Sequence, residues 1–273
     1  MKTRLLTAVV YPVILIIGLI AYLYSTAPTP LPDGVPHEQA SISVDQLFRA
    51  LASENNEIRG TFTREIVGEG EKHGLIFDEG WRQPNIVAGP LPALFLRSIS
   101  RKMARNNTEV GLFLGSDFPI EQSNSFTQTQ QEKFERLKRT GQTFPYFDES
   151  TKLYTAMFPD YATATACVSC HNQHPDSPRT DWEIGDMMGA TTWTFPRRFV
   201  SAREALNLIQ EFRGAAGSTW NEYLNEVADL TEAPTIGSQW PKDGYFLPDA
   251  ETFIENCAQR SGSKTLEHLL KQP

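Results

Sequence analysis

The chain has 273 residues, of which 40% are hydrophobic and 21% are charged, so it can bury a sizeable core. Its formal net charge is -8 and it contains no long run of Lys and Arg, which argues against a nucleic acid as a partner.

Residues 1–24 predict a membrane anchor. The stretch from Leu5 to Tyr24 contains no charged residue and, as a helix, is long enough to cross a hydrocarbon core of about 30 Å. Lys2 and Arg4 precede it, so the positive-inside bias predicts a single-pass protein of the bacterial inner membrane, with most of the chain in the periplasm. A cleaved signal peptide is the alternative, although its apolar core is usually shorter, about 7–15 residues.

The next segment predicts a linker that leads into a long helix. Residues 25–42 hold four prolines and one glycine, a composition typical of an extended spacer. Ser43 then begins an amphipathic helix, and Gln46 can complete a capping box with it. Apolar side chains recur at spacings of three and four residues as far as Ile66, and Gly68 is predicted to stop the helix.

Shorter helices and strands are predicted beyond this helix. A proline in the first turn marks a helix that begins near Pro90 and ends near Asn106. The other predicted elements are helices over residues 126–139, 198–212, 250–260 and 264–271, and strands over residues 110–114, 144–147, 153–158 and 189–195.

Residues 166–172 read Ala-Cys-Val-Ser-Cys-His-Asn and contain a Cys-x-x-Cys-His run, the attachment signature of a c-type haem. Two thiols at this spacing can each form a thioether with one vinyl group of the porphyrin, and the adjacent histidine can supply an axial nitrogen to the iron. We therefore predict one covalent haem c, anchored by Cys167 and Cys170, with His171 as the proximal iron ligand.

Three other interpretations of this run are open. A zinc site would need two more Cys or His ligands at a similar spacing, and the third cysteine, Cys257, stands alone. A redox-active dithiol would need a thioredoxin-like strand and helix around it. A structural disulfide between Cys167 and Cys170 would leave the role of His171 unexplained.

Residues 67–195 resemble a family of extracytoplasmic haem-c-binding domains of bacterial signalling proteins. The resemblance rests on residues 89–97 and on the run 166–178, which reads Cys-x-x-Cys-His-Asn-x-His-Pro-Asp-Ser-Pro from its first cysteine and continues through residues 181–186. It covers about half of the chain. It implies an α+β, PAS-like fold, in which a small antiparallel sheet is flanked by helices and the haem is held at one side.

The anchor, the linker and the resemblance together divide the chain. We expect an anchor over residues 1–24, a linker over residues 25–42, a haem-binding PAS-like domain over residues 43–200 and a mostly helical C-terminal extension over residues 201–273. Members of the family inside signalling proteins usually continue into a second membrane helix and a cytoplasmic output module. Here a charged helix follows instead.

The sixth ligand of the iron is open. Some relatives are thought to use a cysteine upstream of the haem motif, and this chain has none before Cys167. His73, in the loop after the long helix, and Cys257 are the leading candidates for the sixth ligand. The methionines Met103, Met157, Met187 and Met188 are candidates too, but are better explained as core residues. His174 is too close to His171 to reach the opposite face of the haem without a sharp reversal. With no sixth ligand from the protein, the iron would be open to NO, CO or O₂.

Together these features predict a membrane-anchored, exported c-type haem protein that acts as a redox or gas sensor through a partner protein. The alternative is a periplasmic electron-transfer cytochrome with one haem. An enzyme is not expected, because the chain contains neither a Gly-x-Ser-x-Gly elbow nor a phosphate-binding loop. The expected partners are the membrane, a signalling or redox protein and a small gas molecule, and no nucleic acid.

Overall fold

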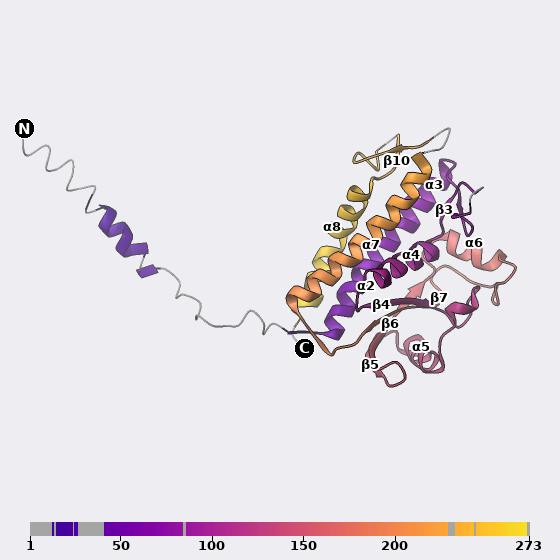
Figure 1. Ribbon diagram of the computed structural model, residues 1–273, viewed down its shortest axis with the longest axis horizontal. Helices are drawn as coiled ribbons and strands as arrows, with labels where there is room; N and C mark the ends of the chain where they lie inside the picture. Colours follow the sequence, from indigo (N-terminus) through magenta and orange to yellow (C-terminus); the bar gives the residue numbers. More distant parts are fainter. Residues whose placement is uncertain are drawn as a thin grey trace, which may run out of the picture. The chain divides into compact units, whose positions relative to one another are not determined.

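The computed structural model divides into two compact units, Met1–Gln39 and Ala40–Pro273. The structure describes residues 13, 15–23, 25–26, 41–83, 86–228, 233–242 and 244–271 (Figure 1).

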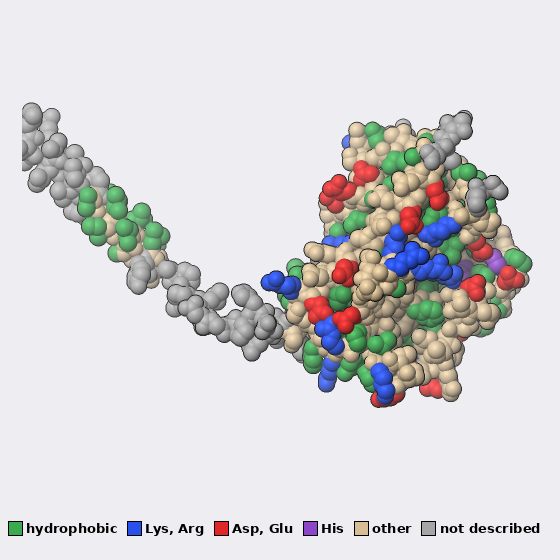
Figure 2. Space-filling model, in the orientation of Figure 1, with side chains coloured by type: hydrophobic (Ala, Val, Ile, Leu, Met, Phe, Trp, Pro, Cys, Tyr) green, Lys and Arg blue, Asp and Glu red, His purple; other side chains and the backbone are tan. Residues whose placement is uncertain are grey.

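In the first unit, residues 15–23 are helical and their aliphatic side chains are exposed (Figure 2). Nowhere in the described part of the chain is a helix both long enough and apolar enough to span a bilayer. The predicted anchor over residues 5–24 is therefore contradicted, and with it the predicted single-pass location in the inner membrane. The described helical run is shorter than the roughly 20 apolar residues that a span needs. Residues 5–12, 14 and 24 lie outside the described residues, as do residues 27–40 of the predicted linker.

A long helical segment begins the second unit. α2 (Val44–Thr61) continues without a break into a π-helical segment, η1 (Phe62–Val67), and then into α3 (Gly68–Lys72). The predicted capping box of α2 is confirmed. The hydroxyl of Ser43 accepts a hydrogen bond from the Gln46 N–H at 3.3 Å, and the Gln46 side chain accepts one from the Ser43 N–H at 2.9 Å.

The prediction that Gly68 stops this segment is wrong, since Gly68 and Gly70 both lie in α3. Gly70 packs against Leu75 and Phe77, so closely that a Cβ atom in its place would come within 3.0 Å of Leu75. Tertiary packing here outweighs the low helix propensity of glycine.

Four antiparallel strands form the central sheet in the order β4–β7–β6–β5. Each corresponds to one of the four predicted strands, and the predicted α+β class is confirmed. The strands are β4 (Gly111–Gly115), β5 (Pro145–Asp148), β6 (Leu153–Tyr161) and β7 (Met187–Phe195).

Helices cover both faces of this sheet (Figure 1). α4 (Pro92–Arg105) and α7 (Ala202–Ala228) lie with α2 on one face, and α5 (Gln128–Thr140) lies on the other. Alternation along β7 matches this arrangement, because successive side chains of a strand point to opposite faces. Trp193 belongs to the large core beneath α2, α4 and α7, whereas Ala190 packs with the apolar side chains of α5.

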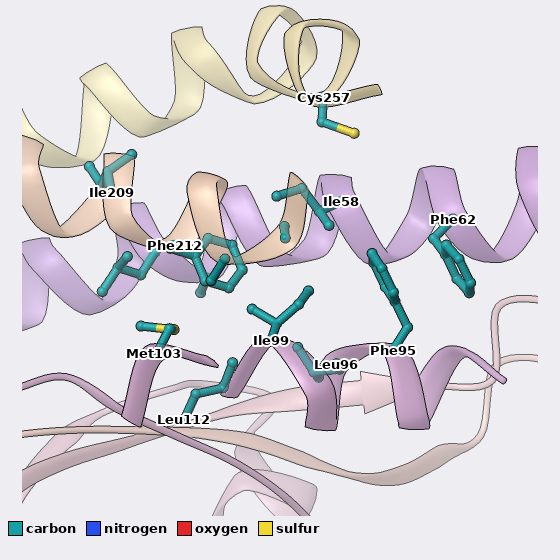
Figure 3. Close-up of a cluster of buried hydrophobic side chains, with 14 of the residues drawn as sticks. Ile58, Phe62, Phe95, Leu96, Ile99, Met103, Leu112, Ile209, Phe212 and Cys257 are labelled. Atoms are coloured by element: carbon teal, nitrogen blue, oxygen red, sulfur yellow. The ribbon is translucent and has the colours of Figure 1, made fainter. Parts of the chain in front are cut away.

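Side chains from several elements converge in the main core (Figure 3). Ile58 from α2, Ile99 and Met103 from α4, and Ile209 and Phe212 from α7 are all buried there. The apolar stripes predicted from residue spacing therefore face one shared interior.

α8 (Ala250–Leu270) packs along α2 as one continuous helix, so the predicted break near residues 261–263 is wrong. Contacts with α2 keep α8 helical across residues 261–263. For example, the Thr265 hydroxyl donates a hydrogen bond to Glu54 Oε1 at 2.6 Å. The domain boundary predicted after residue 200 stays a prediction, and helices on both sides of it share the main core.

Short strand pairs complete the second unit. Phe199–Ser201, predicted as the start of a helix, instead form β8 and pair antiparallel with β1 (Ser41–Ser43). The aromatic and β-branched residues of β8 suit this pairing. The remaining short elements are β2 (Phe77–Asp78), β3 (Gly89–Pro90), η2 (Gln122–Asn124), β9 (Thr235–Ile236) and β10 (Tyr245–Leu247).

Candidate functional site

The Cys-x-x-Cys-His run lies on α6 (Thr165–Gln173), a short helix between β6 and β7. Residues three and four positions apart share one face of a helix, so Cys167, Cys170 and His171 point to the same side. Both thiols are free and partly exposed. No residue of α6 is fully buried, so contacts other than a deep apolar core hold this helix in place.

The end of β6 directs the chain into α6. The pairing of β6 with β7 shifts register between Asp160 and Tyr161, as a β-bulge does. Just beyond, the Ala162 N–H donates to the Asp186 carbonyl at 2.9 Å, and the Gly185 N–H donates to the Ala162 carbonyl at 2.9 Å. These bonds close the loop that carries α6.

Asn172 ties the end of α6 to the loop that follows. Its Nδ2 donates to the Trp182 carbonyl at 3.0 Å, and its Oδ1 accepts from the Trp182 N–H at 2.9 Å. The buried Trp182 ring stands nearly perpendicular to the His171 ring, with centroids 6.3 Å apart. Asn172 thereby fixes both the helix and the aromatic wall beside His171.

Arg179 organises the rest of this loop. Its guanidinium lies over the Trp182 ring, 3.9 Å from the centroid, and donates to Asp181 at 2.6 Å and Asp186 at 3.1 Å. The Ser177 hydroxyl donates to the Arg179 carbonyl at 2.7 Å. The residues that extend the motif beyond Cys-x-x-Cys-His therefore build a hydrogen-bonded support for α6.

A further contact links α6 with the segment between β2 and β3. His174 Nδ1 accepts from the Asp176 N–H at 3.1 Å, so Nε2 is the nitrogen that donates to Glu79 Oε1, 3.2 Å away. Both ring nitrogens of His174 are engaged in these bonds. His174 is therefore placed to support the site and has no free lone pair for a metal.

An ion pair that the sequence did not indicate lies beside the motif. Arg59 of α2 pairs with Asp160, and their side chains are only 17% and 16% exposed. Burial disfavours the charge on Arg59, but the attraction of Asp160 outweighs burial and holds the pKa of Arg59 above its ordinary value. The two residues are 101 positions apart, so no local pattern could have revealed the pair.

The surroundings of the motif favour the uncharged forms of the Cys170 thiol and the His171 imidazole. Burial lowers the pKa of His171 below its ordinary value, and the carboxylate of Asp160 opposes this only in part. Burial, followed by the charge of Glu79, raises the pKa of Cys170. Near neutral pH His171 is therefore a neutral imidazole, the form that binds metals. Its Nδ1 is buried and has no hydrogen-bond partner in the described structure.

Comparison with protein families agrees with the class of domain that the sequence indicated. The Tll0287-like family model matches residues 37–196, a span that includes α2, the central sheet and α6. The chain belongs to the Tll0287-like family. This is a family of sensor-type domains associated with cytochrome c. Comparisons with curated proteins and with solved structures give no match.

Both candidate sixth ligands of this Tll0287-like chain are engaged elsewhere. His73 is the C-cap residue of α3, and its ring stacks on Phe246 with centroids 3.8 Å apart. Cys257 is buried between α8 and α2 beside Thr61, and burial raises the pKa of its thiol to about 12. Residues 59 and 61 point to different sides of α2, so Cys257 does not share the side of Arg59. Among the described residues, no hydrogen bond, ion pair or ring contact joins either candidate to α6.

The surroundings of α6 in this Tll0287-like chain suit a covalently held apolar group. Cys167 and Val168 rest on a small cluster of Ala162, Trp182 and Met188. Other large apolar side chains remain exposed in the segments that contact α6 or Trp182. They are Ile76 and Val87 beside β2 and β3, Phe118 against Trp182, and Ile184 in the loop before β7.

A porphyrin held at the two thiols would need apolar surface of this kind, and the thiols with the neutral imidazole of His171 are the donor set that haem c takes. The residues present therefore fit haem c. A bare metal ion would need several ligands together, and the described residues contain no group of three or more His, Cys, Asp and Glu side chains placed to hold one.

Proposed function

We propose that this protein carries one haem c, bound covalently through Cys167 and Cys170 with His171 as the proximal iron ligand, and that it acts as a redox or gas sensor through a partner protein. The observation that carries the proposal is the placement of two free thiols and one neutral imidazole on one face of α6. Membership of the Tll0287-like family supports the sensor role.

When bound, the haem supplies an iron that changes oxidation state by one electron and can take a small ligand such as NO, CO or O₂. The chain's own residues hold and orient the site. His171 would offer Nε2 to the iron, because Nδ1 is buried. Asn172 keeps α6 fixed on Trp182, and Trp182 limits rotation of the imidazole.

The places of His73 and Cys257 favour a sensor over an electron carrier. A carrier works best with two firm axial ligands, whereas a gas sensor needs an exchangeable position on the iron. Since His73 stacks on Phe246 and Cys257 is buried against α2, neither side chain would supply a second axial ligand to a haem held at α6. The small antiparallel sheet with helices on its faces is compatible with a PAS-like sensor domain, and we expect no enzymatic activity.

Haem staining tests the attachment. The full chain is expressed with a c-type haem maturation system, and the denatured protein is stained on a gel for haem peroxidase activity. We expect a stained band for the natural sequence and none for the Cys167→Ala, Cys170→Ala double variant. Cys257→Ala is the matched control, because it removes the remaining cysteine and should keep the stain. An unstained band from the natural sequence would overturn the proposal.

The same preparation, reduced and exposed to CO, separates a sensor from a carrier. We expect CO to shift the Soret band, because neither His73 nor Cys257 would occupy the position opposite His171. An absorption spectrum that does not change when CO is added, together with rapid reduction of a soluble cytochrome, would identify an electron-transfer protein instead. His73→Ala should leave the spectrum of the reduced protein unchanged, and a changed spectrum would identify His73 as the sixth ligand.

A further inference from the structure

The Arg59–Asp160 ion pair is the feature near α6 that the proposed function leaves unused. It joins α2 to the end of β6, and both side chains are largely withdrawn from solvent. Removing two charges from water costs free energy that their attraction only partly returns. A buried ion pair is therefore weak evidence for a purely stabilising role, and the place of this pair beside the motif points to an effect on a neighbouring group.

Two backbone irregularities flank the pair. β6 shifts register directly after Asp160, and α2 becomes π-helical at Phe62, three residues after Arg59. The Thr63 hydroxyl donates to the Arg59 carbonyl at 2.8 Å, at the start of this π-helical segment. β-Bulges and π-helical turns occur often at functional sites, where they redirect individual side chains. Here they lie on the two elements that bring Arg59 and Asp160 together.

The pair lies close to the thiols and the imidazole of the motif. Asp160 stands two residues before Ala162, which packs in the small cluster that supports Cys167. Cys167 is close enough to Arg59 that its thiolate form would raise the pKa of the guanidinium. Among the described ionisable groups, Asp160 has the largest electrostatic effect on His171. The carboxylate of Asp160 therefore acts on the proposed iron ligand, and the ion pair places the guanidinium of Arg59 next to that carboxylate.

This position excludes one common role for a buried arginine near a haem, which is to bind a propionate. The vinyl groups that react with the thiols and the two propionates lie at opposite edges of a porphyrin. Because Arg59 lies near Cys167, it would face the vinyl edge of a haem attached there. Its partner is moreover already a carboxylate of the protein, Asp160.

We propose that Arg59 and Asp160 together set the reduction potential of the iron held by His171, an inference that rests on the proposed haem attachment. Reduction of Fe(III) to Fe(II) takes one electron from a one-electron donor and lowers the positive charge of the site by one. A nearby carboxylate favours Fe(III), and a nearby guanidinium favours Fe(II). In a partly buried site such charges are weakly screened by solvent.

The inference predicts that Asp160→Asn and Arg59→Gln shift the midpoint potential in opposite directions. The midpoint potential of the haem-loaded full chain is measured by spectroelectrochemical titration. Asp160→Asn leaves Arg59 unpaired and should raise the potential, whereas Arg59→Gln leaves Asp160 unpaired and should lower it. We expect each variant to change the equilibrium constant for reduction about tenfold, which is about 59 mV for one electron. The double variant should return close to the natural value, and Arg59→Lys, which keeps the charge, should remain there.

The ion pair between Glu54 and Arg213 provides a matched control. It also involves α2, it is bidentate at 2.7 Å for both bonds, and it links α2 to α7. Residues 54 and 59 point to different sides of α2. Glu54→Gln and Arg213→Gln should lower thermal stability and leave the reduction equilibrium constant unchanged within about twofold.

Potentials that do not move, or that move in the same direction in both single variants, would overturn the inference. A structural disturbance that lets water reach the haem acts regardless of the sign of the charge removed. If Asp160→Asn does not fold, the comparison of Arg59→Gln with Arg59→Lys decides the question alone. A natural chain without a haem stain would instead remove the proposed function itself, so the two failures are distinguishable.

Discussion

α7 and α6 belong to the same compact unit, but they are held in place by different interactions. α7 buries large side chains along its length, and Phe212 and Trp220 are both 0% exposed. α6 has no fully buried residue, and its neighbours hold it through the bonds of Asn172 to Trp182 and of His174 to Glu79. Deep apolar burial therefore dominates in one region, whereas polar contacts together with the small cluster beneath Cys167 and Val168 hold the other.

The two kinds of contact should make α6 less stable locally than α7. Full burial of a large apolar side chain contributes about 1.5–3 kcal/mol, whereas a hydrogen bond contributes about 1 kcal/mol net. α6 should therefore open locally more often than α7. A haem bound at Cys167 and Cys170 would add the apolar contacts that α6 lacks, so the attachment of the cofactor would complete the packing of this region.

The largest expected effect comes from the core of α7. Phe212→Ala removes a ring that stands nearly perpendicular to Trp193 with centroids 5.5 Å apart. Truncation of a buried Phe costs about 3–5 kcal/mol, so the midpoint of denaturant unfolding should fall sharply. Phe147→Ala, at an exposed position of β5, is the control and should change the midpoint little. Equal midpoints for the two variants would contradict the assignment of Phe212 to the main core.

A smaller and more local effect is expected at α6. Asn172→Ala removes both bonds to the Trp182 backbone and should cost about 1–2 kcal/mol of local stability. Amide hydrogens of α6 should then exchange about 5–30 times faster, while exchange in α7 stays unchanged. Gln173→Ala, at the exposed end of the same helix, should leave exchange at its natural rate. Faster exchange throughout the unit would mean that α6 is not a separate region of low stability.

Local signals in the sequence were sufficient for much of the fold. The capping box of Ser43 and Gln46 is read from residues three apart, and it forms as predicted. Long-range packing decided the exceptions. Gly70 remains helical because Leu75 and Phe77 pack against it, and α8 continues past its predicted break because Thr265 bonds to α2. Neither contact can be predicted from the spacing of apolar residues or from local helix propensity.

The site shows the same division between local and distant information. The motif itself is local, and the structure brings Cys167, Cys170 and His171 to one face of α6, although the helix was not predicted. Arg59 and Asp160 come from α2 and β6, so only the fold could reveal their pairing. A histidine in a loop can reach many places, and for this reason sequence position alone could not show that His73 stacks on Phe246.

The smallest expected effect is a pH dependence that again separates the two regions. Burial, reinforced by the charge of Arg49, lowers the pKa of His268 in α8, and burial lowers the pKa of His171 in α6. A histidine whose pKa is depressed on folding binds its proton more readily when unfolded. Its contribution to stability is therefore full above the ordinary pKa of about 6.5 and is lost as the pH falls through the lower, folded-state value.

In the haem-loaded protein His171 would be bound to iron and would no longer titrate, whereas His268 would titrate with or without haem. We therefore expect the free energy of unfolding to fall more steeply between about pH 7 and pH 5 in the haem-free Cys167→Ala, Cys170→Ala variant than in the haem-loaded chain. His268→Gln should flatten both curves by the same amount, because it removes only the contribution from α8. Equal slopes with and without haem would mean that coordination does not withdraw His171 from titration, and the role of proximal ligand would then have to pass to another residue.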